Sequence, residues 1–459
     1  LWVAESYSYK EWEKRGEDRV LVFEDTDGDG RFDSRKVFWD EGRHISSVEV
    51  GFGGVWVIDV PNLLFIPDRD SDDRPDSDAE VKLTGFILKA SHNMANGLRW
   101  GPDGWLYGRH GVLAKSSVKI PGAEPLAGIE GEFDCAIWRY HPTADGGRFE
   151  VFCRGMTNPW GMDWNGHGDV FFSGNVNGHL WHGIRGARYD RMFGEGFFPH
   201  AYRRLGPCAD HLHHAGDWGE WTNTRSDDGK GAHDRFGGGH SHCGLMIYRG
   251  DNWPAEYRGR AFLCNTHGRR VNSERLEVQG SGYVARHEDD FLLANNAWFK
   301  GVEMVYGPDG GVYLADWCDY GECHDSDGVH RSSGRIYKIT YGKPNEIPPR
   351  LRDLNKLDSM QLAALQTHPN AFFATHARRI LQERSAIAGE GIDEATVSRL
   401  WAIATTAEST EHRINALWAL HCTGSLGRAQ HARLRADNED AIVAWSLARE
   451  FPSQSDLLK

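Results

Sequence analysis

Cysteine, histidine and acidic side chains occur together in DWCDYGECHDSDGVHR, residues 316–331. A haem group that is attached through cysteines requires two residues between the cysteines of a Cys-x-x-Cys-His motif. Four residues separate Cys318 from the Cys323-His324 pair, so this segment is not a haem attachment site. It is either a local Cys318–Cys323 disulfide loop or a loop that contributes acids, histidines and an arginine to a larger site.

A second histidine-rich segment is GGGHSHCG, residues 237–244. Residues two apart lie on the same side of an extended strand, so His240 and His242 face the same way. This spacing suits a transition-metal ion or a polar ligand. The alternative is a glycine-rich loop whose histidines are solvated.

Two acidic loops have the same spacing. DTDGDGRFD (25–33) and DRDSDDRPD (68–76) carry aspartates at positions 1, 3, 5 and 9, as an EF-hand-type calcium loop does. The candidate calcium ligands are Asp25, Asp27, Asp29, Asp33, Asp68, Asp70, Asp72 and Asp76. Lys36 and Ala79 replace the glutamate of position 12, so the ion would need another donor, such as Asp78. We expect structural calcium at both loops, and the alternative is a solvated acidic turn.

The elements that position these residues repeat along the chain. GPDGWLYGRHG (101–111) resembles GPDGGVYLADW (307–317), and four further segments follow the same strand–turn–strand plan, at 1–6, 51–60, 165–175 and 257–268. Repeats of about 40–50 residues with several short strands are typical of β-propellers. The sequence therefore predicts an all-β, six-bladed β-propeller over 1–340, with an insertion at 183–239. We expect the first inner strand to lie upstream of Leu1.

The character of the chain changes after a linker at 341–350. Residues 351–459 show apolar spacing near 3.6, which predicts all-α, HEAT-like helical repeats. We expect these helices to act as packing and spacing elements, without a direct part in chemistry.

Composition excludes some classes of function. The 459 residues carry a formal net charge of −14, which argues against a nucleic-acid-binding surface. No apolar run approaches the roughly 20 residues of a membrane span. The eight cysteines form no zinc-binding pattern. Cys135 and Cys153 flank a hairpin-like stretch and are either paired or buried as free thiols.

Propeller topology sorts the polar residues by position. The Gly/Asp turns between the two strands of each motif belong at the back of the ring, and the flanks of each motif belong at the front. Loops that gather titratable residues at one mouth indicate a site. The predicted catalytic residues are His110, His267, Arg109, Arg269 and Asp316. The predicted substrate- or cofactor-binding residues are His92, Asn96, Asn175, His179, His182, Asn265, His324, His330 and Arg331.

Four long segments carry a resemblance to a known family: HNMANGLRWGPDGWLYGRHG, NPWGMDWNGHGDVFFSGNVNGHLWH, GGGHSHCGLMIYRGDNWPAEYRGRAFLCNTHGRRVN and DWCDYGECHDSDGVHRSSGRIYKI. They resemble the membrane-bound dehydrogenase domain of large planctomycete and verrucomicrobial proteins, over most of residues 1–340. The resemblance implies a signal peptide before the propeller, HEAT-type repeats after it and a c-type haem domain that this chain lacks. A periplasmic or extracellular location follows from the same resemblance.

The propeller is also distantly similar to soluble quinoprotein glucose and sorbosone dehydrogenases. That similarity implies pyrroloquinoline quinone (PQQ) at the mouth, a histidine base and arginines near the quinone. We expect an oxidoreductase acting on a sugar or other polyol, with His110 or His267 as base and Arg109 or Arg269 stabilising negative charge. Electrons would pass to the haem domain or another acceptor. The alternatives are metal-assisted carbohydrate cleavage by His240 and His242, or a propeller that binds carbohydrate or protein without catalysis.

Overall fold

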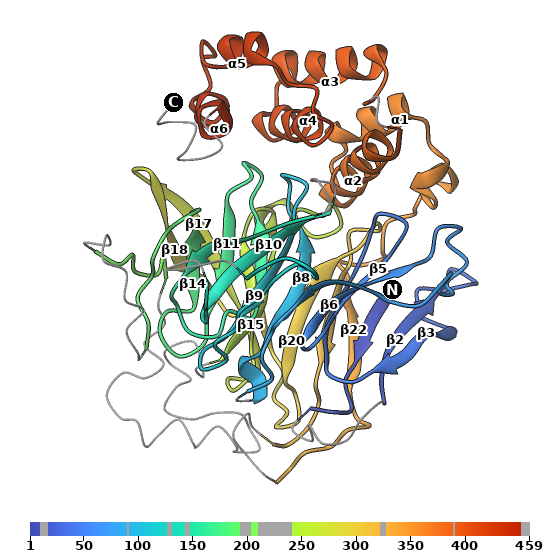
Figure 1. Cartoon of the computed structure of the whole chain (residues 1–459), viewed down its shortest axis with the longest axis vertical. Coiled ribbons are helices and arrows are strands. Elements are labelled where there is room, and N and C mark those ends of the chain that lie inside the picture. Colours follow the sequence, from blue (N-terminus) through green and yellow to red (C-terminus); the bar gives the residue numbers. More distant parts are fainter. Residues whose placement is uncertain are drawn as a thin grey trace.

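The chain folds into a β-rich part and a helical part that covers one end of it (Figure 1). This computed structural model describes residues 1–9, 17–89, 91–125, 131–142, 147–192, 203–209, 241–321, 327–388 and 391–450. No helix in these ranges is both long and apolar enough to cross a membrane.

The β-rich part consists of six antiparallel sheets in the described ranges. The first sheet contains β1 (Trp2–Glu5), β2 (Asp18–Glu24) and β3 (Ser34–Gly42). The second contains β4 (Ile45–Val50), β5 (Gly54–Asp59), β6 (Asn62–Pro67) and β7 (Glu80–Thr84). The third contains β8 (Asn96–Trp100), β9 (Leu106–His110), β10 (Ala136–His141) and β11 (Arg148–Arg154).

The other three sheets follow in chain order. The fourth contains β12 (Met162–Trp164), β13 (Val170–Ser173) and β14 (Leu180–Gly183). The fifth contains β15 (His242–Ile247), β16 (Ala261–Asn265), β17 (Arg270–Gln279), β18 (Gly282–His287) and β19 (Leu292–Leu293). The sixth contains β20 (Gly301–Tyr306), β21 (Val312–Asp316) and β22 (Arg335–Ile339).

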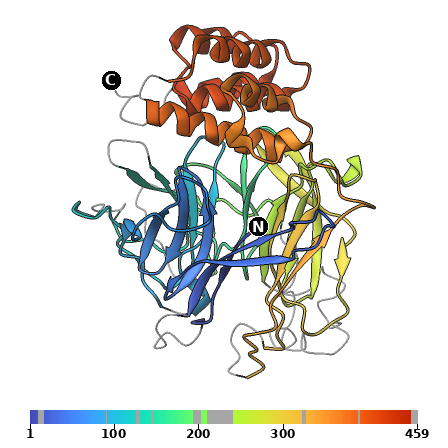
Figure 2. The ribbon, with the colours of Figure 1, turned by 90° about the vertical axis from the view of Figure 1, so that its right-hand side faces the viewer.

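The sheets are arranged around a common centre, as in a propeller (Figure 2). The first strands of successive sheets contact each other: β1 with β4, β4 with β8, β12 with β15, and β15 with β20. Arg99 on β8 donates a hydrogen bond of 3.3 Å to the carbonyl of Met162 on β12. Arg331, which follows β21, donates bonds of 2.7 and 2.8 Å to the carbonyls of Tyr7 and Tyr9 near β1. The last sheet is therefore tied to the first.

Large aromatic side chains fill the spaces between the sheets. Trp56 on β5 and Trp138 on β10 are both buried and belong to one cluster that joins the second and third sheets. Gly108 lies against the Trp138 ring, where a Cβ would not fit. All six residues of β5 are buried, which explains its continuous apolar pattern, because both of its faces are covered.

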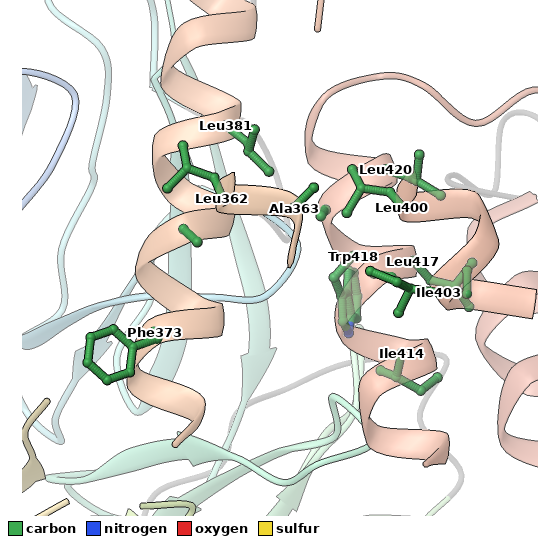
Figure 3. Close-up of a cluster of buried hydrophobic side chains, with 14 of the residues drawn as sticks. Leu362, Ala363, Phe373, Leu381, Leu400, Ile403, Ile414, Leu417, Trp418 and Leu420 are labelled. Carbon is green, nitrogen blue, oxygen red and sulfur yellow. The ribbon is translucent and has the colours of Figure 1, made fainter. Parts of the chain in front are cut away.

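The helical part contains six α-helices among the described residues. They are α1 (Ser359–Ala364), α2 (Ala371–Ala388), α3 (Glu394–Thr406), α4 (Thr410–Cys422), α5 (Arg428–Leu434) and α6 (Asp440–Glu450). Asp358 forms a capping box with Gln361 at the start of α1. Figure 3 shows Leu381 of α2 and Leu417 of α4 in the apolar cluster between the helices. That these helices form HEAT-like repeats stays a prediction.

The helices lie on the Gly/Asp turns that the sequence assigns to the back of the ring. Gln382 on α2 donates to the carbonyl of Gly104 at 3.0 Å, and Asn370, which precedes α2, donates to the carbonyl of Gly307 at 3.0 Å. Glu383 accepts a bond of 2.7 Å from the backbone N–H of Phe52. Turns of three different sheets therefore bond to the segment that contains α2. We call this end of the ring the rear and the opposite end the front.

Candidate functional site

A central cavity of about 1920 Å³ runs between the first strands of the sheets. Its walls include residues of β4, β8, β12 and β20. Residues of α2 and α4 also line it, among them His376, Arg378 and Trp418. The expectation that the helices serve only for packing and spacing was therefore too narrow, because their docking at the rear makes them part of the cavity wall.

Bulges in the first strands open the cavity wall. The pairing of β8 with β9 shifts between Asn96 and Arg99, and β4, β15 and β20 carry similar shifts near their front ends. In β8 the bulge contains Gly97, whose φ is +60°. The guanidinium of Arg109, from the second strand, occupies the space that a Cβ on Gly97 would need. Glycine at this position thus lets Arg109 reach the cavity from β9.

Arg109 is a buried cation with few partners. Its side chain is 4% exposed and lines the cavity. Nη2 lies 3.5 Å from a carboxylate oxygen of Glu303 on β20, and Nε has no hydrogen-bond partner among the described residues. Burial lowers the pKa of Arg109, and Glu303 opposes that shift. The free donor makes this guanidinium available to an anionic or strongly polar ligand.

Asp316 lies at the end of β21, in the same cavity wall. Its Oδ1 accepts backbone N–H bonds from Lys300 (2.7 Å) and Cys318 (2.9 Å). Its Oδ2 is buried without a hydrogen-bond partner in the described part of the chain. Burial raises the pKa of Asp316. One oxygen is therefore fixed, and the other can accept a proton.

Seven of the predicted residues lie on the cavity wall. They are His92, Asn96, Arg109, Asn175, Asp316, His330 and Arg331. Asn96, Arg109 and Asp316 lie at or near the ends of strands, and the other four lie in the connections before or after strand pairs. Among the predicted residues, the cavity wall therefore combines two arginines, two amides, one carboxylate and two histidines.

The structure does not bring His110 to the cavity. Its ring is fully buried between Phe86 and Phe133, and Nε2 lies 2.6 Å from the Ser116 hydroxyl. Burial lowers the pKa of His110 to about 4. His267 and Arg269 are also buried and absent from the cavity wall. Neither His110 nor His267 lines the cavity, so the structure does not support the prediction that one of them is the base at the mouth.

His179, His242 and Asn265 are part of a separate buried network. Asn265 lies 3.2 Å from Nε2 of His242, and the rings of His179 and His242 are 4.9 Å apart. Nε2 of His179 lies 3.2 Å from a carboxylate oxygen of Glu274 on β17, which is also fully buried. This network ties the fourth sheet to the fifth, and none of these three predicted residues lines the cavity.

The remaining predicted residues either lie away from the cavity wall or fall outside the described residues. His182 packs against Phe171 and Tyr283 and is not on the cavity wall. His240 and His324 lie outside the described residues, as does Cys323, so the predicted metal pair and the Cys318–Cys323 loop are not described. Cys135 and Cys153 are free, buried thiols.

A charged cluster at the rear of the cavity was missed by the sequence predictions. Glu49, Arg99 and Asp163 stand at matching positions on three first strands, two residues before the turn. Arg99 pairs with Asp163 at 3.4 Å. Burial raises the pKa of both Glu49 and Asp163. In the sequence, these residues could have been found as charged side chains that stand at the same position of three first strands, two residues before the turn.

Each of the two acidic loops brings three carboxylate groups close together. Carboxylate oxygens of Asp25, Asp27 and Asp29 lie within 4.8 Å of one another, and the same holds for Asp68, Asp70 and Asp72. The aspartates at position 9 instead accept hydrogen bonds from backbone N–H groups. Asp33 accepts from the N–H of Thr26 (3.1 Å), and Asp76 accepts from the N–H of Arg69 (2.7 Å). They close the loops rather than joining the oxygen clusters.

We expect calcium chelation to lower the melting temperature by a few degrees, because each loop would be left with three repelling carboxylates. Differential scanning calorimetry with EDTA, and then with excess CaCl₂, measures the effect. An Asp27→Asn, Asp70→Asn double variant should respond less to EDTA. Identical melting curves with and without EDTA would contradict calcium binding.

One family comparison covers most of the chain. Residues 1–343 match the model of a domain of unknown function, DUF7133. The chain belongs to the DUF7133 family. The DUF7133 domain thus contains all six sheets and ends just before the helices. A search of curated proteins gave no match.

Solved structures with low similarity were also found for this DUF7133 protein. One is described as a glucose dehydrogenase (TM-score 0.44, 16% identity, covering 71% of this chain and 91% of the other). The PQQ-bound aldose sugar dehydrogenase of Streptomyces coelicolor gives a TM-score of 0.41 and 17% identity, covering 70% and 90%. The apo aldose sugar dehydrogenase of Escherichia coli gives 0.41 and 14%, also covering 70% and 90%.

Proposed function

We propose that the front of the central cavity is the active site of a dehydrogenase that oxidises a sugar or other polyol. The proposal rests mainly on Oδ2 of Asp316, which is buried without a hydrogen-bond partner among the described residues. The same cavity is lined by Arg109, whose Nε also has no partner there. A polyol oxidation needs a group that takes the hydroxyl proton and a cation that stabilises negative charge. These two residues supply both.

Asp316 replaces the histidines as the proposed base. Its two backbone N–H bonds fix one oxygen, so the other keeps a constant direction. Its raised pKa brings the carboxylate closer to the pKa that general-base catalysis at neutral pH requires. A hydroxyl group that donates to Oδ2 would satisfy the buried oxygen and place its proton for transfer.

The cavity wall has donors that suit a quinone carrying carboxylates, such as PQQ. Arg109 has a free Nε, and the buried Lys300 and the half-buried Arg331 also line the cavity. When bound, such a quinone supplies the two-electron acceptor for the carbon-bound hydrogen of the alcohol. Arg109 would bind and orient it, and Glu303 would hold the guanidinium in place from the opposite wall.

The proposal also covers the architecture, the bound calcium and the location of the whole protein. The six sheets would be the blades of a six-bladed propeller, followed by HEAT-like repeats and, in a longer chain, a c-type haem domain that accepts the electrons. Calcium would occupy the acidic loops, and the protein would work in the periplasm or outside the cell. Metal-assisted cleavage by His240 and His242 is not favoured, because the buried His242 points to Asn265 rather than into the cavity.

Reconstitution tests the proposal. The purified chain is incubated with PQQ and CaCl₂ and assayed by dye reduction with a panel of aldoses and polyols. We expect turnover with at least one sugar and none without the quinone. A chain that takes up no quinone and reduces no dye would contradict the proposal, and glycan binding without turnover would favour the non-catalytic alternative.

A further inference from the structure

The rear of the cavity contains a buried guanidinium that its surroundings do not neutralise. Arg378 on α2 is 5% exposed and lines the cavity. Among the described residues it forms no hydrogen bond or ion pair, and its Nη1 is buried without an acceptor. Buried charges are normally paired, because removal from water is costly. An unpaired arginine that faces a cavity therefore indicates that something else supplies the acceptor.

The neighbouring acids are already engaged. Asp103 accepts bonds from Arg139 (2.6 Å) and Tyr107 (2.8 Å). Cys422, also near Arg378, is a buried thiol whose pKa is raised to about 12, so it carries no charge at neutral pH.

Arg249 is a basic neighbour of Arg378 and is itself paired with an acid. Arg249 lies close enough to lower the pKa of Arg378 further, although burial is the main cause of its fall to about 10. Arg378 remains protonated at neutral pH. The acid that pairs with Arg249 is Glu411, at 2.8 Å, and it also binds Arg258. Asp103 and Glu411 are therefore both bonded to other groups, and neither pairs with Arg378 in the described part of the chain.

A second buried donor lines the same cavity. The indole of Trp418 on α4 is 2% exposed, and its Nε1 has no acceptor in the described part of the protein. The helices α2 and α4 pack side by side, as Figure 3 shows. The two helices thus each contribute a side chain that lines the rear of the cavity and has a buried N–H donor without an acceptor in the described residues.

We infer that the rear of the cavity binds the carboxylate or phosphate group of a small ligand, with Arg378 as its charged donor. A guanidinium presents parallel N–H groups that match the oxygens of either anion. The site would be built jointly by the sheets and the helical part, which gives the docked helices a role in ligand binding. The inference does not depend on the dehydrogenase reaction at the front.

Isothermal titration calorimetry with the whole chain tests this inference. Sodium phosphate and sodium acetate are titrated separately at constant ionic strength against a chloride background, without sugar or quinone. We expect at least one of the two anions to bind, and the stronger of the two identifies the class of oxyanion. Arg378→Gln should weaken binding at least about tenfold, which corresponds to losing a charged hydrogen bond. Arg378→Lys keeps the charge but loses the parallel N–H donors of the guanidinium, and it should weaken anion binding less than Arg378→Gln does.

The matched control is Arg399→Gln, which removes an exposed arginine from α3 and should leave the affinity unchanged. Where Arg378→Gln does not fold, crystals of the parent protein grown with selenate provide a second measurement. An anomalous peak within hydrogen-bond distance of Arg378 supports the site. Equal affinities in the parent and Arg378→Gln, no heat with either anion, or selenate bound only elsewhere would show that water alone solvates Arg378 and would overturn the inference.

Discussion

Replacing Asp316 with asparagine should reduce the turnover of the reconstituted protein by about 10²–10⁴-fold, because the amide cannot take the hydroxyl proton. The fold should be retained, since the amide oxygen can still accept the backbone N–H bonds of Lys300 and Cys318. KM should change little. Steady-state kinetics and a thermal melt on the same preparation measure the two effects.

The pH profile separates a base from a merely structural residue. The pKa of Asp316 is raised by burial, so the reconstituted parent protein should gain activity as the pH rises through that raised value. The activity of Asp316→Asn should not show this rise with pH. Asp40→Asn, an exposed acid on β3, is the control and should keep both the rate and the profile. Full activity in Asp316→Asn would exclude Asp316 as the base.

Replacing Glu411 with glutamine should destabilise the docking of the helices by about 2–3 kcal/mol, because Arg249 and Arg258 lose the carboxylate that they share. The pKa of Glu411 is lowered to about 2, mainly by the two arginines acting against burial. A group whose folded pKa is depressed stabilises the fold above its unfolded pKa of about 4.3, and the contribution disappears as the pH falls towards 2.

The measurement is the melting temperature as a function of pH. The parent should lose stability between about pH 4.3 and 2 more steeply than Glu411→Gln does. Glu408→Gln removes the same charge from an exposed position just before α4 and should melt like the parent. Equal melting temperatures for Glu411→Gln and the parent at pH 7 would show that this ion pair does not hold the helices to the sheets.

Much of the architecture follows from the sequence alone. The repeated strand–turn–strand motifs predicted a mostly-β part of several sheets followed by helices, because period-2 and period-3.6 patterns are local properties of the chain. The identical spacing of the acidic loops predicted four ligands in each loop, and the structure brings three of the four carboxylates together in each. Calcium binding stays a prediction. The Gly/Asp turns were correctly assigned to one end of the ring, since strand order fixes which connections share an end.

The composition of the site was decided by the tertiary structure. A residue at the flank of a strand pair can face the cavity or the space between two sheets, and the sequence does not distinguish these directions. His110 turns into the aromatic core, whereas Arg109, its neighbour, passes over Gly97 into the cavity. The bulge in β8 makes that passage possible, and it depends on pairing with a neighbouring strand. The position of Arg378 at the rear of the cavity likewise depends on docking, because α2 lies on turns that are more than 60 residues away in the chain.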